Sequence, residues 1–144
     1  MKIQNIFLIN YDNILSQFSE KKLPQKISFA ITKNLLLIAK ELEPYQKSLS
    51  NIIKSYDEYI EKDDKGEQIT LPIGVPKVDD KHINDYLKEI DELLQIEIDF
   101  DFYYIDDNVF DYDDNGKYDP MSAKDIIMLR DILCKGDDNE KAER

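Results

Sequence analysis

The chain is poor in the residues on which enzymes and metal sites most often depend. Its 144 residues include one histidine, one cysteine and four glycines. A lone cysteine, Cys134, cannot form an internal disulfide and favours a reducing compartment. One histidine and one cysteine are too few for a structural zinc site. The four glycines are not clustered, so the sequence has no Gly-rich phosphate loop.

The chain also has few of the residues that nucleophilic catalysis usually requires. His82 lies near the predicted start of a helix, where histidine is more typical of a surface residue than of a general base. Cys134 follows an inward-facing helix edge and is more typical of a small core residue than of a nucleophile. Long apolar runs are missing too, because no stretch approaches the roughly 18 apolar residues of a membrane-spanning helix. We therefore expect a cytoplasmic protein that is not an enzyme, needs no cofactor and contacts no membrane.

Negative charge dominates the chain and is unevenly distributed. The formal net charge is −12. Residues 1–50 hold seven lysines and four acidic residues, whereas residues 89–119 hold twelve acidic residues and one lysine. An acidic surface of that density repels nucleic acid, so we expect no direct nucleic-acid binding. It suits a basic partner, a cation, or simple solubility.

Residues 25–62 organise the predicted fold as one long helix. Apolar residues recur there in steps of four and three, which is the heptad spacing of a helix edge. This seam consists of Ile31, Leu35, Ile38, Leu42, Tyr45, Leu49, Ile52, Tyr56 and Tyr59. Pro44 predicts a kink near residues 40–44, or a break into two helices.

A second helix is predicted over residues 79–95, after a cap at Asp79 or Asp80. Its seam has the same spacing and consists of Ile83, Leu87, Ile90 and Leu94. Each seam needs a partner, so we expect the two helices to pack as an antiparallel hairpin. Ser122 and Asp125 form a capping box that predicts a last helix, with Gly136 as its stop.

A small sheet is predicted from residues 2–9 and 96–119. The first strand would lead into a short helix capped by Asn10 or Asp12. Residues 96–104 alternate strictly, which is typical of a half-buried strand. Its inward residues would be Ile96, Ile98, Phe100, Phe102 and Tyr104, and its outward residues Glu97, Asp99 and Asp101. The prediction is thus a mainly helical α+β fold in one compact domain, residues 1–136, with a disordered polar tail over 137–144.

The stretch from Asp111 to Asp119 contains a motif with metal chemistry. Asp111, Asp113 and Asn115 match positions one, three and five of a calcium loop, Gly116 position six and Asp119 position nine. Position twelve, normally a bidentate glutamate, is Ser122, which would weaken any Ca²⁺ site. Asn115-Gly116 is also the strongest signal for a type I′ hairpin turn, here between two tyrosines. The sequence is therefore compatible with either a plain β-hairpin or a weak calcium site.

The acidic residues that follow Ile96 have two interpretations. One is a solvated sheet face. The other is a phosphate mimic that occupies the basic groove of a nucleic-acid-binding protein, since carboxylates recur along an extended segment among aromatic residues. The residues that would face such a partner are Glu97, Asp99, Asp101, Asp106, Asp107, Asp113 and Asp114.

Two stretches carry a resemblance to a known family. The first begins Leu23-Pro24-Gln25-Lys26-Ile27-Ser28-Phe29 and leads into a charged helix that ends Ile52-Ile53-Lys54-Ser55-Tyr56. The second is Leu87-Lys88-Glu89-Ile90-Asp91-Glu92-Leu93-Leu94, followed by Glu97-Ile98. Over about residues 20–100 the chain resembles the DUF1617-like family of small phage and prophage proteins of Gram-positive bacteria. The resemblance implies a phage origin and an interaction role, and we expect the protein in the cytoplasm of the host cell.

Three functional hypotheses follow. The first is a phage-encoded binding protein that inhibits a host nucleic-acid-handling defence enzyme, in the manner of anti-CRISPR or anti-restriction proteins, through its acidic face. The second is a virion or tail-assembly accessory protein that forms homo-oligomers through its long helix as a coiled coil. The third is a weak calcium-binding module. A groove mimic should lose affinity steeply as salt rises, whereas an apolar helix seam should not.

Overall fold

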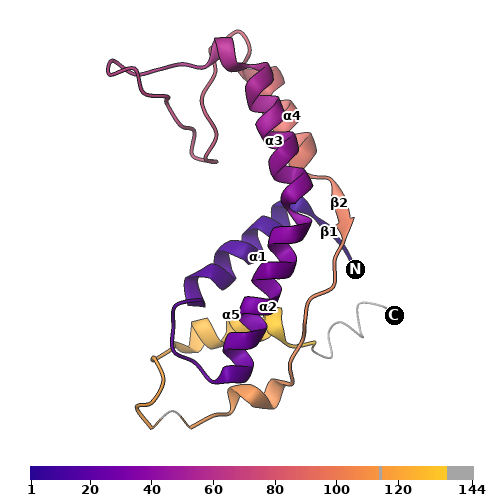
Figure 1. Ribbon diagram of the computed structural model, residues 1–144, viewed down its shortest axis with the longest axis vertical. Coiled ribbons are helices and arrows are strands. Elements are labelled where there is room, and N and C mark those ends of the chain that lie inside the picture. The colour runs from indigo at the N-terminus through magenta and orange to yellow at the C-terminus, as the bar shows by residue number, and fades with distance from the viewer. Residues whose placement is uncertain (114, 136–144) are drawn as a thin grey trace.

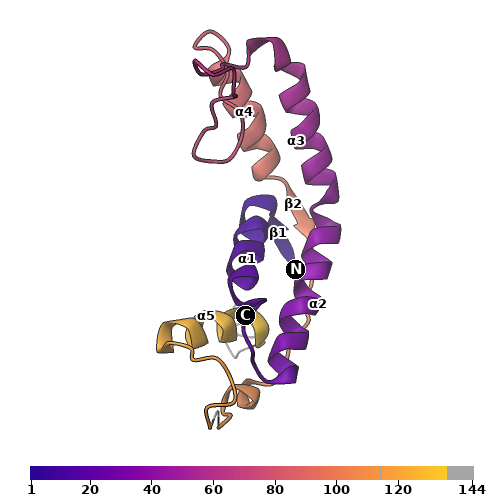
Figure 2. The same cartoon turned by 60° about the vertical axis from the view of Figure 1, so that its left-hand side comes forward.

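The computed structural model describes residues 1–113 and 115–135. The molecule is elongated and mainly helical, with one small antiparallel sheet in the described residues (Figure 1). Helices α2 (Gln25–Glu41) and α3 (Glu43–Ser55) follow one another along the long axis. Helix α1 (Asn5–Phe18) packs on α2 and helix α4 (Ile83–Leu94) packs on α3. Helix α5 (Ala123–Leu133) lies crosswise at the end of the molecule opposite α4 (Figure 2).

The predicted helix over 25–62 is two helices that meet at Leu42. This residue keeps near-helical backbone angles (φ −85°, ψ −5°), so α3 continues in roughly the direction of α2 (Figure 2). Pro44 lies in the first turn of α3, where a missing N–H breaks no helical hydrogen bond. The prediction was wrong about the end of the helix: α3 stops at Ser55, and a short 3-10 turn, η1 (Asp57–Tyr59), follows it.

The apolar seam divides between two clusters. On α2, Ile31 and Ile38 are fully buried in a cluster that also contains residues of α1, α5 and the segment 100–110. Leu49 and Ile52 of α3, and Tyr56 directly after it, are only half-buried, in a second cluster formed with α4 and residues 71–78. The two halves differ because several elements cover α2, whereas α3 is covered mainly by α4 and one loop.

The strand predicted over residues 2–9 is much shorter in the structure. Strand β1 covers only Lys2–Gln4, and α1 begins at Asn5. Ile3, Phe7 and Ile9 on one face favoured a strand, but Leu8, Leu15 and Phe18 recur at helical spacing and are buried in the first cluster. Burial of that helix face outweighs the local strand preference. The caps predicted at residues 10 and 12 are therefore wrong.

The sheet predicted over residues 96–119 is also mostly absent from the described residues. Strand β2 covers Glu97–Asp99 and pairs antiparallel with β1, with Ile3 opposite Ile98. One backbone hydrogen bond extends the pairing at each end, from the Phe100 N–H to the Met1 carbonyl and from the Asn5 N–H to the Ile96 carbonyl, and no further strand follows in the described residues. The chain then runs beside α2 to the 3-10 turn η2 (Asp107–Phe110) (Figure 1). Ile96 is 51% exposed, so the inward face begins only at Ile98.

Two buried asparagine side chains hydrogen-bond to backbone groups of distant segments, which longer strands would otherwise have held in place. Asn34, fully buried on α2, accepts a hydrogen bond from the Tyr103 N–H (2.8 Å) and donates to the Tyr103 carbonyl (3.0 Å) and the Ala30 carbonyl (2.9 Å). Asn5 donates from its side chain to the Leu93 carbonyl at the end of α4. Each asparagine thus fastens a distant segment to a helix.

The capping box of α5 is confirmed. The Ser122 hydroxyl accepts a hydrogen bond from the Asp125 N–H, and the Asp125 carboxylate accepts one from the Ser122 N–H. Leu129 and Leu133 are fully buried, and Cys134 is buried next to them, as expected for a core cysteine. The predicted stop at Gly136 and the predicted tail over 137–144 lie outside the described residues.

The connector between α3 and α4 forms an arm at the opposite end of the molecule (Figure 1). Isolated bridges join Ile60 to Val78, Lys62 to Gln68 and Thr70 to Pro76. The buried Tyr86 of α4 anchors the arm, because its hydroxyl donates to the Pro76 carbonyl at 2.7 Å. None of the helices in residues 1–113 and 115–135 has the length and apolarity that a membrane crossing requires.

Candidate functional site

The predicted partner-facing carboxylates lie along the segment that leaves β2 and continues past η2. All the described members are exposed, and we call them the acidic edge: Glu97, Asp99, Asp101, Asp106, Asp107 and Asp113. The seventh predicted member, Asp114, lies outside the described residues. The strict alternation holds from residue 97 to residue 102, with Phe100 and Phe102 buried between exposed acids. The structure therefore brings Glu97, Asp99 and Asp101 to one surface.

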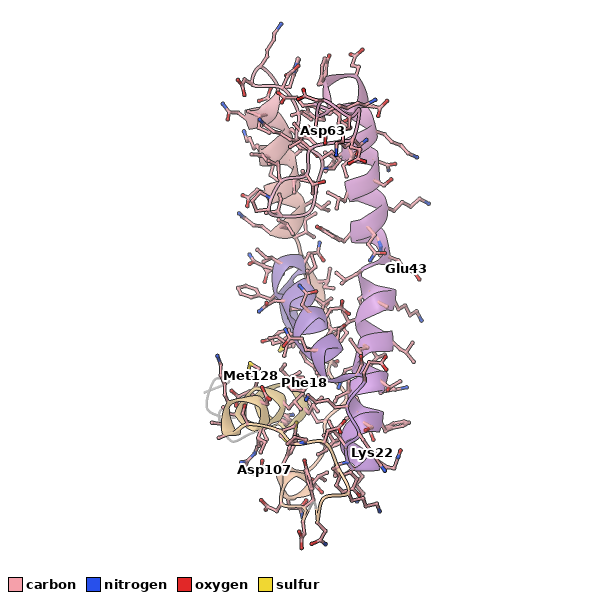
Figure 3. All side chains as sticks on the ribbon, turned by 90° about the vertical axis from the view of Figure 1, so that its left-hand side faces the viewer. Phe18, Lys22, Glu43, Asp63, Asp107 and Met128 are labelled. Atoms are coloured by element: carbon pink, nitrogen blue, oxygen red, sulfur yellow. The ribbon has the colours of Figure 1, made fainter. Side chains whose placement is uncertain are left out.

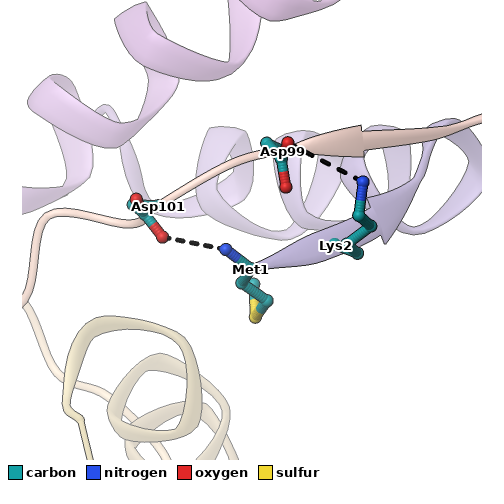
Figure 4. A network of polar contacts seen from close by, with 4 residues as sticks. All are labelled: Met1, Lys2, Asp99 and Asp101. Carbon is teal, nitrogen blue, oxygen red and sulfur yellow. Dashed lines mark hydrogen bonds and ion pairs between the residues drawn. The ribbon is translucent and has the colours of Figure 1, made fainter.

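Cations from the start of the chain lie against this surface (Figure 4). The Lys2 ammonium lies 3.8 Å from the Asp99 carboxylate, and the Met1 amino group lies 3.1 Å from the Asp101 carboxylate. The antiparallel register puts Lys2 opposite Asp99. The sequence offered no basic residue close to these acids, but β1 supplies two positive charges from about a hundred residues away. The Asp99 and Asp101 side chains nonetheless stay 77% and 89% exposed.

Asp107 has a stronger internal partner. The Arg130 guanidinium of α5 donates two hydrogen bonds to its carboxylate, at 2.7 and 2.6 Å. These bonds lower the pKa of the Asp107 carboxyl below its ordinary value. Among the described residues, Glu97, Asp106 and Asp113 have no cation within ion-pair distance. Asp107 serves to hold η2 on α5, so the free negative charge of the edge comes from the other members.

An apolar hollow adjoins the acidic edge next to Glu97. It has a volume of about 430 Å³ and is lined by Met1, Lys2, Ile3, Gln4, Phe7, Tyr11 and Glu97. Met1 and Phe7 are each 53% exposed there. An exposed apolar depression with charged groups at its rim has the composition of a protein-binding surface. The strand predicted over residues 2–9 concealed this hollow, because it would have put residues 7 and 9 on a buried sheet face.

The predicted calcium loop is only partly assembled. Asn115 and Gly116 both have positive φ (46° and 75°), as a type I′ turn requires, and Tyr112 and Tyr118 meet edge to face. The Asn115 N–H donates to the Asp113 carboxylate, but the Asp119 carboxylate accepts a hydrogen bond from the Lys22 N–H at 2.6 Å. No group of three metal-binding side chains is found in the described residues. The hairpin prediction was right about the turn, but strands do not flank it in the described part.

We expect millimolar Ca²⁺ to leave the melting temperature unchanged, because Asp119 is held by Lys22 and Ser122 is used to cap α5. The measurement is a thermal melt with and without Ca²⁺. A ligand bound only by the native state would raise the melting temperature. A rise that disappears in Asp111→Ala would show that the loop is a calcium site after all.

A groove that the sequence did not indicate lies between the start of α2 and the segment 103–109. It has a volume of about 510 Å³ and is lined by Gln25, Lys26, Phe29, Tyr103, Tyr104, Ile105, Asp106 and Val109. Phe29 is 57% exposed, and its ring meets Tyr103 edge to face, with centroids 5.6 Å apart. One sequence signal was present: Phe29 lies off the apolar seam, so a helix over 25–62 had to expose it.

The residues considered for catalysis have structural partners. The His82 ring stacks on Tyr59, and its Nδ1 lies 2.6 Å from the Asp79 carboxylate. The hydrogen bond from His82 lowers the pKa of the Asp79 carboxyl. Burial raises the pKa of the Cys134 thiol, which disfavours the reactive thiolate. These contacts fasten the arm to α4 and fill the core.

Similarity to known proteins adds nothing to this geometry. No protein-family model, curated protein or solved structure matches the chain. The acidic edge, the hollow and the groove therefore have to be interpreted from their own chemistry, and the DUF1617-like resemblance stays a prediction.

Proposed function

We propose that this chain is a non-catalytic binding protein that attaches to a basic groove of a partner protein through its acidic edge. The observation that carries the proposal is the exposure of Glu97, Asp99 and Asp101 on one side of an extended segment, directly beside the apolar hollow. Charged groups around an apolar centre give an interface both steering and anchorage. Alternate residues of an extended chain lie about 7 Å apart, so the carboxylates form a regular row.

The partner class is a protein that handles nucleic acid. Such a protein has a groove lined by lysine and arginine, and a row of carboxylates can occupy it in place of phosphates. The internal ion pairs of Asp99 and Asp101 do not prevent this, because exposed pairs of this kind are weak and a partner arginine can replace them. With the phage origin that the resemblance implies, the partner would be a host defence enzyme that the chain inhibits.

Oligomerisation through the long helix is less well supported. The apolar seam of α2 and α3 packs on α1 and α4 within the same chain. A coiled coil between copies would have to displace these helices. The covered seam therefore favours the binding role over the assembly role.

The test reverses charge on the edge. Asp99→Lys/Asp101→Lys should weaken binding at least tenfold and slow association with the partner, because steering and complementarity are both lost. The partner is first captured from host lysate with the parent chain, and Kd and association rates are then measured on the purified pair. Asp64→Lys/Glu67→Lys is the matched control, since it makes the same charge change in the loop that holds Asp63, at the end of the molecule opposite Asp107 of the acidic edge (Figure 3).

The parent complex should also dissociate steeply with salt, and duplex DNA should compete for the partner's groove. Folding of the edge variant should be unchanged rather than improved, because Lys2 and the Met1 amine already neutralise part of the edge. An edge variant that binds the partner as tightly as the parent at low salt would refute the proposal.

A further inference from the structure

A lysine recurs at every seventh residue along α2 and α3. We call these residues the lysine stripe: Lys26, Lys33, Lys40, Lys47 and Lys54. Residues seven apart lie almost on one line along a helix, about 10.5 Å from each other. The stripe therefore extends about 42 Å along α2 and α3, and it turns around the helix by about 20° per heptad. It lies on the outer side of the rod formed by α2 and α3, because the lysines from Lys33 to Lys54 each follow a seam residue by two positions, or about 200° around the helix.

All five lysines are exposed. Within residues 1–113 and 115–135, no carboxylate lies within ion-pair distance of any of them. Glu43, at the junction of the two helices, is the acidic residue closest to the stripe in helical position (Figure 3). Lysines therefore outnumber acidic residues along this face, where Glu43 follows Lys40 by three residues and precedes Lys47 by four.

Exposed apolar side chains lie beside the stripe lysines, at positions where a face that contacts only solvent would have polar residues. Phe29 and Leu36 each follow a stripe lysine by three residues, and they are 57% and 66% exposed. Lys26 and Phe29 also line the groove that contains Tyr103. The first part of the stripe therefore combines positive charge with an accessible pair of aromatic rings.

Although the net charge of −12 led us to expect no direct nucleic-acid binding, we propose that the lysine stripe and the groove bind single-stranded nucleic acid. The lysines, about 10.5 Å apart, contact phosphates at intervals along one strand, and a base enters the groove to stack on the ring of Phe29 or of Tyr103, whose planes are 72° apart. The Asp106 carboxylate at the groove accepts a hydrogen bond from an amino group of that base. Lysine provides point charges without the planar fork of arginine, so the contact is with the backbone and tolerates any sequence.

Other occupants fit these observations less well. A two-fold dimer through this face would place lysines against lysines. A lipid surface would bury Asp106 beside the aromatic pair without a partner, which is costly in an apolar medium. A duplex keeps its bases stacked inside the helix, out of reach of the groove. A single strand satisfies both the charge and the aromatic rings.

The test measures fluorescence anisotropy of end-labelled oligothymidine and oligouridine of about 20 nucleotides, at salt from about 50 to 200 mM. Lys26→Ala/Lys33→Ala/Lys40→Ala should weaken binding at least tenfold and reduce the slope of log K against log salt by about two, at about 0.7 per lost phosphate contact. Lys62→Ala/Lys65→Ala/Lys81→Ala changes the net charge of −12 by the same three units on exposed residues away from the stripe, and should bind like the parent.

Phe29→Ala/Tyr103→Ala should weaken binding about tenfold without changing the salt slope, because stacking releases no counterions. Asp99→Lys/Asp101→Lys changes neither the stripe nor the groove and should still bind the oligonucleotides. Asp106 is a residue that the acidic edge and the groove share, but loss of partner binding in this variant does not require loss of oligonucleotide binding. The inference is overturned if the parent binds neither oligonucleotide up to about 100 µM at the lowest salt, or if the two lysine variants bind equally. It is equally overturned if Phe29→Ala/Tyr103→Ala binds the oligonucleotides like the parent. Binding of the parent to phosphatidylserine vesicles, with no binding to either oligonucleotide, would also overturn it.

Discussion

Asn34→Ala should lower the free energy of unfolding by about 2–4 kcal/mol, because each buried polar group left without a partner costs about 1–3 kcal/mol. Asn34 makes three hydrogen bonds from a fully buried position, two of them to the backbone of Tyr103. Alanine leaves the Tyr103 N–H and carbonyl without these partners. The loss should be visible as a lower denaturation midpoint in urea with little change in m value.

Hydrogen exchange gives a second measurement of the same contact. The Tyr103 amide should lose its protection in Asn34→Ala well before the amides of α2 do, because local opening then requires no buried bond to break. The control is Asn51→Ala, which makes the same chemical change at an exposed position of α3 and should be close to neutral. If Asn34→Ala were as stable as the parent, the segment after β2 would be held on α2 by its aromatic side chains alone.

Leu42→Ala should cost about 2–5 kcal/mol through the cavity that it leaves. Leu42 is 5% exposed and belongs to the cluster that joins α1, α2 and α5. It also stands between α2 and α3, and its carbonyl accepts the hydrogen bond from the Gln46 N–H. The better helix propensity of alanine returns only a few tenths of a kcal/mol, so packing decides the result.

Leu36→Ala is the matched control for Leu42→Ala. It removes the same atoms from the same rod, but Leu36 is on the exposed face of α2. We expect a change within about 0.5 kcal/mol. Equal effects of the two substitutions would mean that the seam is not the core of this part of the molecule.

The elements that could be predicted from the sequence are those whose defining residues lie only a few positions apart along the chain. The seam from Ile31 to Leu42 and the box at Ser122 and Asp125 depend on spacings of three, four and seven residues, which a helix converts directly into one face or one cap. The exposure of Glu97, Asp99 and Asp101 follows equally directly from alternation. For that reason the sequence could predict the mainly helical α+β class and the candidate acidic surface.

The lengths of the strands and the neutralisation of the acidic edge could not be predicted in this way. Residues 6–9 form a short apolar run that is compatible with a strand, but they are helical and Leu8 is fully buried in the cluster shared with α2. Lys2 meets Asp99 only because β1 pairs with β2. Such choices depend on which distant surface offers the larger apolar area or an opposite charge, and a local pattern carries no information about either.

The sequence by itself determined the helical rod, its seam, its last capped helix and the heptad period of its lysines. Tertiary structure decided which of these features meet. It placed Tyr103 on Asn34 across 69 residues and the Met1 amine on Asp101 across 100 residues, and it brought Phe29 to the groove beside Tyr103. The physical reason is that spacing along the chain fixes the direction of a side chain on its own helix or strand, whereas its partner is fixed by packing between elements.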